Sequence, residues 1–196
     1  EAPAAAPAPA AAAATDQIPL PALQESDPFI RDKFGALSAD PLMTTWLKGT
    51  GLARTLAVVV ENSARGLSPS KHLRVLAPMG KFKVMRQGTR VYIDPTNYDR
   101  FDAIAMAAAA IDPAAAGKLY SAIKPLLQVA YDELGNNEPI DRAVERAISG
   151  LAGAPIVDTD IRVELDDAGI GYRFEDPSLE NMSGAQKQLI RMGPRN

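Results

Sequence analysis

An aspartate is followed by a proline at five places along this chain, and these pairs limit where helices can begin. The residue before a proline is kept out of the helical region, and its carboxylate can accept hydrogen bonds from the free N–H groups of a helix start. Proline itself suits the first helical turn. We therefore interpret the five aspartates as helix caps and turns, and not as catalytic acids. The pairs are Asp27-Pro28, Asp40-Pro41, Asp94-Pro95, Asp112-Pro113 and Asp176-Pro177.

The segments after and between these pairs have the apolar spacing of helices. Apolar residues recur every three or four positions, so that one face of each segment can enter a core. Ser183 and Gln186 fit a capping-box pattern, and Pro125 is expected to bend its helix. The spacing predicts helices over 28–37, 41–48, 52–65, 103–111, 119–134, 140–151 and 183–192.

Two stretches instead alternate apolar and polar residues, which is typical of strands. The first, residues 81–93, turns near Gln87-Gly88, and the second, residues 161–174, turns between Asp166 and Gly169. We expect a small antiparallel sheet built from these two hairpins. Because the hairpins lie far apart in the sequence and no βαβ pattern repeats, the predicted fold class is α+β and predominantly helical.

The first fourteen residues differ in composition from the rest of the chain. They contain ten alanines, three prolines and one glutamate, which favours an extended linker over a packed fold. The remainder fits one domain in length, and the chain is 46% hydrophobic and 23% charged, as folded proteins are. We predict a disordered tether over residues 1–15 and a single globular domain over residues 16–196.

Composition excludes several kinds of function. The chain has no cysteine and one histidine, His72, which leaves few ligands for a metal and one base for a Ser-His-Asp arrangement. Its net charge of −3 is unlike that of a nucleic-acid-binding protein. We therefore predict no metal site, no cofactor and no nucleic-acid partner.

Four residues near the end of the helix expected at 52–65 are the strongest candidates for a catalytic group. They are Glu61, Asn62, Arg65 and His72. Glu61 or His72 could act as a general base while Arg65 holds an anion. The structural alternative, which we favour, is a surface pair between Glu61 and Arg65 and a hydrogen bond from His72 to a loop carbonyl. We predict no catalytic residue here and retain Asn62, Arg65 and His72 as binding candidates.

A second candidate surface joins aromatic and amide side chains, as sugar-binding sites do. It comprises Tyr92, Asn97, Tyr98, Arg100 and Phe101. Aromatic faces suit the apolar side of a sugar ring, and amides suit its hydroxyl groups. Tyrosines beside a hairpin also commonly seal the edge of a core, and we favour that interpretation.

The C-terminal end of the chain is basic. Lys187, Arg191 and Arg195 could meet lipid head groups or an acidic partner. Positive charge in the last turn of a helix also complements the helix dipole, which is a sufficient explanation for Arg191.

Five phrases of the sequence occur in a characteristic order, at residues 61–66, 72–73, 92–102, 130–135 and 186–194. Together they resemble the bacterial family known as domain of unknown function 3014. The resemblance runs from about Leu20 to Asn196. It implies a membrane-spanning helix and a proline-rich linker before the domain, and no known activity. By resemblance, this is the soluble part of an anchored protein on the periplasmic face of the inner membrane, with the anchor itself outside this sequence.

Three functions are compatible with these observations. We expect a non-enzymatic protein-binding or scaffold module whose partner is an envelope protein. A domain that binds peptidoglycan or another cell-wall glycan is the second interpretation, and an envelope hydrolase is the third. Contact with the membrane is expected only through the anchor. The expected binding residues are Asn62, Arg65, His72, Tyr92, Asn97, Tyr98, Lys187 and Arg191.

Overall fold

The computed structural model describes residues 20–196, and the tether expected at residues 1–15 lies outside this range. The α-helices are α1 (Asp27–Leu37), α2 (Pro41–Trp46), α3 (Leu52–Ala64), α4 (Asp102–Ala109), α5 (Pro113–Asp132), α6 (Ile140–Ala152), α7 (Pro177–Glu180) and α8 (Gly184–Met192). Short 3-10 helices are η1 (Leu23–Glu25), η2 (Pro69–His72), η3 (Arg74–Leu76) and η4 (Pro95–Phe101). The strands are β1 (Val84–Gln87), β2 (Arg90–Ile93), β3 (Val163–Leu165) and β4 (Tyr172–Phe174). The predicted class, α+β and predominantly helical, is confirmed.

Each Asp-Pro pair lies at a helix start, and four of the five aspartates cap the helix that follows them. The side chains of Asp40, Asp94, Asp112 and Asp176 accept hydrogen bonds from backbone N–H groups at the starts of α2, η4, α5 and α7. Asp27 differs, because Ser26 occupies the N-cap position of α1. The Asp27 carboxylate instead accepts hydrogen bonds from the N–H groups of Gly51 and Leu52, each at 2.8 Å, and so caps α3.

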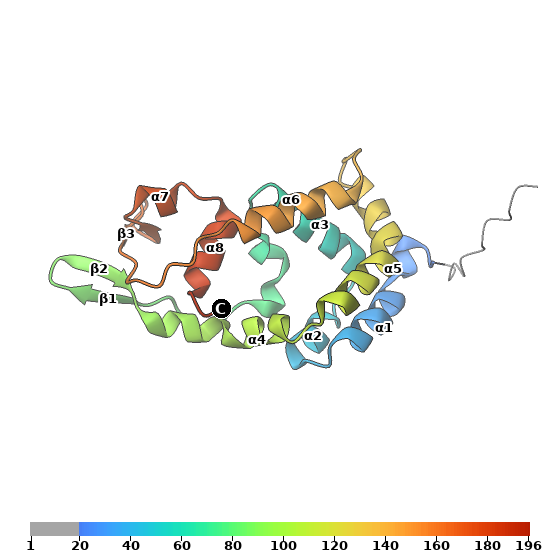
Figure 1. The fold of residues 1–196 in the computed structure, drawn as a ribbon, viewed down its shortest axis with the longest axis horizontal. Helices are drawn as coiled ribbons and strands as arrows, with labels where there is room; N and C mark the ends of the chain where they lie inside the picture. Colours follow the sequence, from blue (N-terminus) through green and yellow to red (C-terminus); the bar gives the residue numbers. More distant parts are fainter. Residues whose placement is uncertain (1–19) are drawn as a thin grey trace, which may run out of the picture.

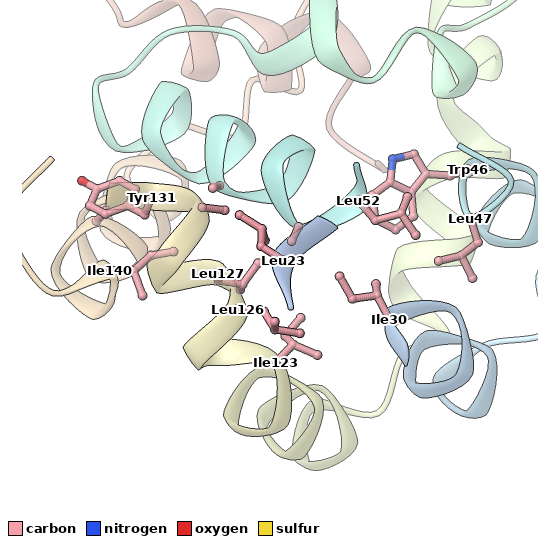
Figure 2. Packing of buried hydrophobic residues seen from close by; sticks show 14 residues of the cluster. Leu23, Ile30, Trp46, Leu47, Leu52, Ile123, Leu126, Leu127, Tyr131 and Ile140 are labelled. Atoms are coloured by element: carbon pink, nitrogen blue, oxygen red, sulfur yellow. The ribbon is translucent and has the colours of Figure 1, made fainter. Parts of the chain in front are cut away.

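The larger hydrophobic core is helical. Helix α3 packs against α5 and α6, while α1, α2 and η1 cover the remaining side. Figure 2 shows side chains from these elements converging around Leu23, which η1 inserts among Leu126, Leu127 and Leu52. The residues before α3 are therefore an integral part of this core.

The smaller core lies between the two hairpins and α8. Strand β1 pairs with β2, and β3 pairs with β4, both antiparallel. A bridge between Tyr92 and Arg162 connects the two ladders, supported by a 2.9 Å hydrogen bond from Ile93 N to Ile161 O. Both hairpins are confirmed, as two two-stranded sheets in contact. They lie at the opposite end of the molecule from α1 and α5 (Figure 1). The buried residues here are Ile93, Ile161, Val163, Phe174 and Ile190.

Candidate functional site

A pocket of about 360 Å³ lies where the two cores meet. One wall comes from η2, η3 and the loop after them, and the others come from η4, α4 and α8. Helix α8 contacts η4, the 3-10 helix that leads into α4. We call it the arginine pocket, because Arg100 and Arg191 line it. Its apolar lining includes Leu73, Leu76, Pro78, Phe82, Ile104 and Met192, and its neutral polar lining includes Ser68, Ser70 and Gln188.

Local turns hold the walls of this pocket in place. Gly66 ends α3 with a φ of +70°, which turns the chain back toward η2. Its carbonyl oxygen accepts a 3.0 Å hydrogen bond from Ala185 N, which ties the start of α8 to the end of α3. Ser68 then caps η2. The walls formed by η2 and α8 are thereby fixed relative to each other.

Arg100 is held by backbone carbonyls and pairs with no carboxylate. Its Nε donates to Met79 O at 3.0 Å, and one terminal nitrogen donates to Gly80 O at 3.1 Å. A third, longer contact of 3.4 Å reaches Asn97 Oδ1. Among residues 20–196, no Asp or Glu lies within ion-pair distance of this guanidinium. Arg100 therefore orders the loop beside the pocket and keeps its positive charge unneutralised.

Arg191 is the more shielded of the two arginines. Its guanidinium carbon lies 5.0 Å from the centroid of the Phe174 ring, and one nitrogen makes a long 3.4 Å contact with Tyr172 O. Burial lowers the pKa of Arg191 from its ordinary value, and the charge of Glu180 opposes this change. Glu180 is itself bonded to Lys187 Nζ at 2.7 Å and Phe174 N at 2.9 Å. No carboxylate in the described chain forms an ion pair with Arg191.

The chain around the arginine pocket is strongly basic. Residues 62–93, which we call the basic run, contain seven Lys and Arg and no Asp or Glu. Of these seven, Arg65 alone forms an ion pair within the described structure. Several apolar side chains of the run are also exposed, including Leu67 at 52%, Val75 at 48% and Met79 at 88%. The surface beside the pocket is therefore both cationic and partly apolar.

Other pockets offer less to a ligand. One, of about 500 Å³, has a lining that includes Asp160, Arg162, Glu175 and Asp176. Arg162 pairs with Glu175 at 2.6 Å, and Asp176 caps α7, so most of these charges are already engaged. A pocket of about 330 Å³ contains Trp46 and His72.

The candidate residues near the end of α3 take part in contacts within the fold. Glu61 accepts a 3.0 Å hydrogen bond from the Tyr131 hydroxyl and pairs with Arg65 at 3.5 Å, as the surface-pair alternative expects. The Asn62 carbonyl accepts from Leu67 N at 2.7 Å. His72 is exposed in η2, and no side-chain hydrogen bond from it occurs within residues 20–196.

The stretch around Asn97 connects the β1–β2 hairpin to η4 through contacts inside the fold. Asn97 is 1% exposed, and its amide bonds Lys83 N, Lys83 O and Asp94 O at 2.6 to 2.8 Å. Phe101 is buried, and burial raises the pKa of Tyr98. Tyr92 pairs with Met85 across the β1–β2 ladder. These side chains chiefly join the hairpin to η4.

Two of the three C-terminal cations have partners. Lys187 pairs with Glu180, and Arg195 pairs with Asp99 and Asp102. Arg191 differs from the other two: it has no carboxylate partner in residues 20–196, and it lines the arginine pocket. Of the expected binding residues, it alone lines the arginine pocket. Arg100 and Phe101 also line the pocket; the sequence interpretation named both in the aromatic and amide surface but did not include them among the expected binding residues. It missed the rest of the apolar lining, for which the acid-free basic run is the available signal.

Four of the five phrases that carry the family resemblance contact one another in pairs. Residues 61–66 meet 130–135 through the Glu61–Tyr131 hydrogen bond. Residues 92–102 meet 186–194 where Tyr98 covers Gly193, at which a Cβ would lie 2.4 Å from the Tyr98 ring. The phrases therefore include the contacts that join the elements of the fold.

The fold and pocket define an α+β domain with an apolar pocket lined by two arginines. A family model described as "Protein of unknown function (DUF3014)" matches residues 52–196, and the chain belongs to this family. The family resemblance is thus confirmed. No curated protein and no solved structure matches the chain. In the part of the chain described here, no helix has the length and apolarity to cross a membrane.

Proposed function

We propose that this domain is a non-enzymatic binding module and that the arginine pocket is its docking site for a segment of a partner protein. The observation behind this proposal is an apolar pocket lined by two arginines that pair with no carboxylate in the described chain. Apolar pockets with a few polar groups are the usual form of binding sites. Arginine, methionine and aromatic side chains are also enriched at the centres of protein interfaces, and Arg100, Arg191, Phe82, Phe101 and Met192 line this pocket.

The arrangement of acids and bases favours binding over catalysis. A general base must lie within hydrogen-bond reach of its substrate and usually of a group that orients it. Glu61 is engaged by Tyr131 and Arg65, while His72 lines a different pocket. The hydrolase interpretation has little support from this geometry. The glycan interpretation also has less support, because the Asn97 amide already bonds the backbone.

The proposal includes an envelope setting. We propose that the domain acts on the periplasmic face of the bacterial inner membrane, tethered by the Ala- and Pro-rich segment, with an envelope protein as its partner. The composition of residues 1–14 supports the tether. Fractionation of cells followed by protease treatment of spheroplasts tests this setting: the domain should remain with membranes and be cut from outside.

Site-specific photocrosslinking tests the docking site. A photoreactive amino acid at Leu76, in the pocket wall, should give one adduct of defined mass in cells that make the whole protein. The matched control is Ile148, which is 62% exposed on α6 and does not line the pocket. The Leu76 adduct should disappear when Arg191→Gln is added. Equal adducts from both positions, or none from Leu76, would reject the pocket as the docking site.

A further inference from the structure

We infer that the segment bound at the arginine pocket is acidic, with an apolar side chain that enters the pocket and carboxylates on either side of it. This inference rests on the proposed function and adds the chemistry of the partner. Three features of the structure support it: the distribution of charge, the pairing of the cations, and the shape and lining of the pocket.

The distribution of charge puts an acid-free segment in one wall of the pocket, although the cations that line the pocket itself are Arg100 and Arg191. The basic run contains seven of the 21 Lys and Arg residues in the chain and none of its 24 Asp and Glu residues. It supplies the η2–η3 wall and Phe82, and Arg100 adds a further cation. This part of an acidic protein is therefore cationic, and charge complementarity favours a partner segment of negative charge.

The pairing of the cations shows that this charge is left available. Outside the basic run, most Lys and Arg side chains pair with a carboxylate, as Arg54 does with Glu133 and Arg146 with Glu138. Lys48 and Lys118 are unpaired on other surfaces of the described chain. Outside the basic run, the other two cations without an ion pair in the described chain are the pocket arginines, Arg100 and Arg191. Unpaired guanidinium groups beside an apolar lining suit a carboxylate next to an apolar side chain, because arginine can bind carboxylates through two parallel hydrogen bonds.

The size of the pocket limits what enters it. A volume of about 360 Å³ lies at the lower end of the range for ligand pockets, roughly 300–1,000 Å³. It suits one or two apolar side chains and not a whole domain. Exposed Val75 and Met79 extend apolar contact beyond the pocket. Arg100 is held by two backbone carbonyls, which reduces the ordering needed when a carboxylate binds.

Peptide display with the whole chain tests the inference. A random library of about 12-residue peptides, the length of a short recognition segment, is selected on the chain and depleted on the Arg100→Gln, Arg191→Gln double variant. Enriched peptides should combine Asp or Glu with Leu, Phe or Trp. In fluorescence anisotropy, each single Arg→Gln change should weaken their binding about tenfold. Lys118→Gln, which removes an unpaired cation from α5, should leave binding unchanged, and raising the salt concentration should weaken it.

Three outcomes distinguish this inference from the proposed function. Pocket-dependent peptides without an acidic bias would overturn the inference and leave the pocket as a protein-binding site. A second outcome is that no pocket-dependent peptide is enriched, but phosphatidylglycerol vesicles retain the chain and not the double variant. Both proposals then fail, and the surface binds a lipid bilayer. If neither binds, both also fail. Circular dichroism of each variant confirms that the fold is intact.

Discussion

At the scale of single residues, Gly193 is the position that best tests the packing of the hairpin end. Its φ of +93° and ψ of 162° lie in a region that side chains other than glycine avoid, and a Cβ would meet the Tyr98 ring at 2.4 Å. Gly193→Ala should lower the free energy of unfolding by about 3 kcal/mol, from backbone strain and overpacking together. Urea denaturation followed by circular dichroism measures the change.

Gly117 is the matched control for this substitution. It lies in α5, and nothing stands within 4 Å of the position its Cβ would take. Gly117→Ala should raise the free energy of unfolding by about 0.5–1 kcal/mol, because alanine is the better helix former. Similar effects from the two substitutions would contradict the account of Gly193.

Among the helices and strands, the start of α3 is capped by a residue of α1. Both oxygens of the Asp27 carboxylate bind N–H groups at the start of α3, 24 and 25 residues away. Asp27→Ala should therefore cost about 1–2 kcal/mol of unfolding free energy, the usual cost of losing a helix cap. Asp32→Ala, which removes an exposed carboxylate of the same helix, should change the stability by less than about 0.5 kcal/mol. Equal costs would show that the cap contributes little.

The junction of α5 and α6 should weaken in acid. Hydrogen bonds from Arg146 lower the pKa of Glu138 from its ordinary value of 4.5, and those from Lys124 and Tyr120 lower the pKa of Asp141. A carboxyl group whose pKa is lower in the folded state stabilises the fold above its unfolded pKa, and this contribution is lost as the pH falls through the folded value. The free energy of unfolding should thus decline below about pH 4.5.

Urea denaturation at a series of pH values measures this dependence. Lys124→Met with Arg146→Met removes the cations that lower the two pKa values, and should flatten the decline between about pH 4.5 and pH 3. Lys118→Met, an unpaired cation on the same helix, is the control. An equal slope in the double variant and the parent would show that other carboxylates dominate.

The elements of this fold were largely predictable, because the signals that define them are local. Asp-Pro caps, apolar spacing and the Ser183–Gln186 capping box each act within a few residues, and the structure contains each of these features. The cap from Asp27 to α3 was missed, since it depends on two helices meeting. The junction between the two hairpins depends in the same way on long-range packing.

The candidate site was much less predictable than the fold. Arg100 and Arg191 lie 91 positions apart in the sequence and reach one pocket only through the packing of α8 beside η4. Their lack of ion pairs becomes visible only in the three-dimensional structure, where the neighbouring cations Lys187 and Arg195 have carboxylate partners. Asn97 and Tyr98 suggested a sugar site by residue type, but burial places Asn97 inside the fold.

In the whole molecule, the arginine pocket lies between the helical core and the hairpin core. Leu73 and Leu76 pack against the helical core, whereas α8 contributes Ile190 to the hairpin core. A segment bound in the pocket would contact elements attached to both. Binding between the two cores should stabilise both of them against unfolding, because a ligand stabilises the folded arrangement that it recognises.

The helical core also extends beyond the region that the family model matches. The match begins at Leu52, but η1, α1 and α2 supply Leu23, Ile30, Trp46 and Leu47 to the core. Residues 20–196 contain the described residues of both cores and should unfold in one cooperative thermal transition. Residues 52–196 lack those four side chains and the Asp27 cap, and should expose Leu52 and Leu126 to water. We expect this shorter chain to show no cooperative transition by circular dichroism and to bind a hydrophobic dye at 25 °C. A cooperative transition within a few degrees of that of residues 20–196 would instead mean that α3, α5 and α6 fold without the N-terminal helices.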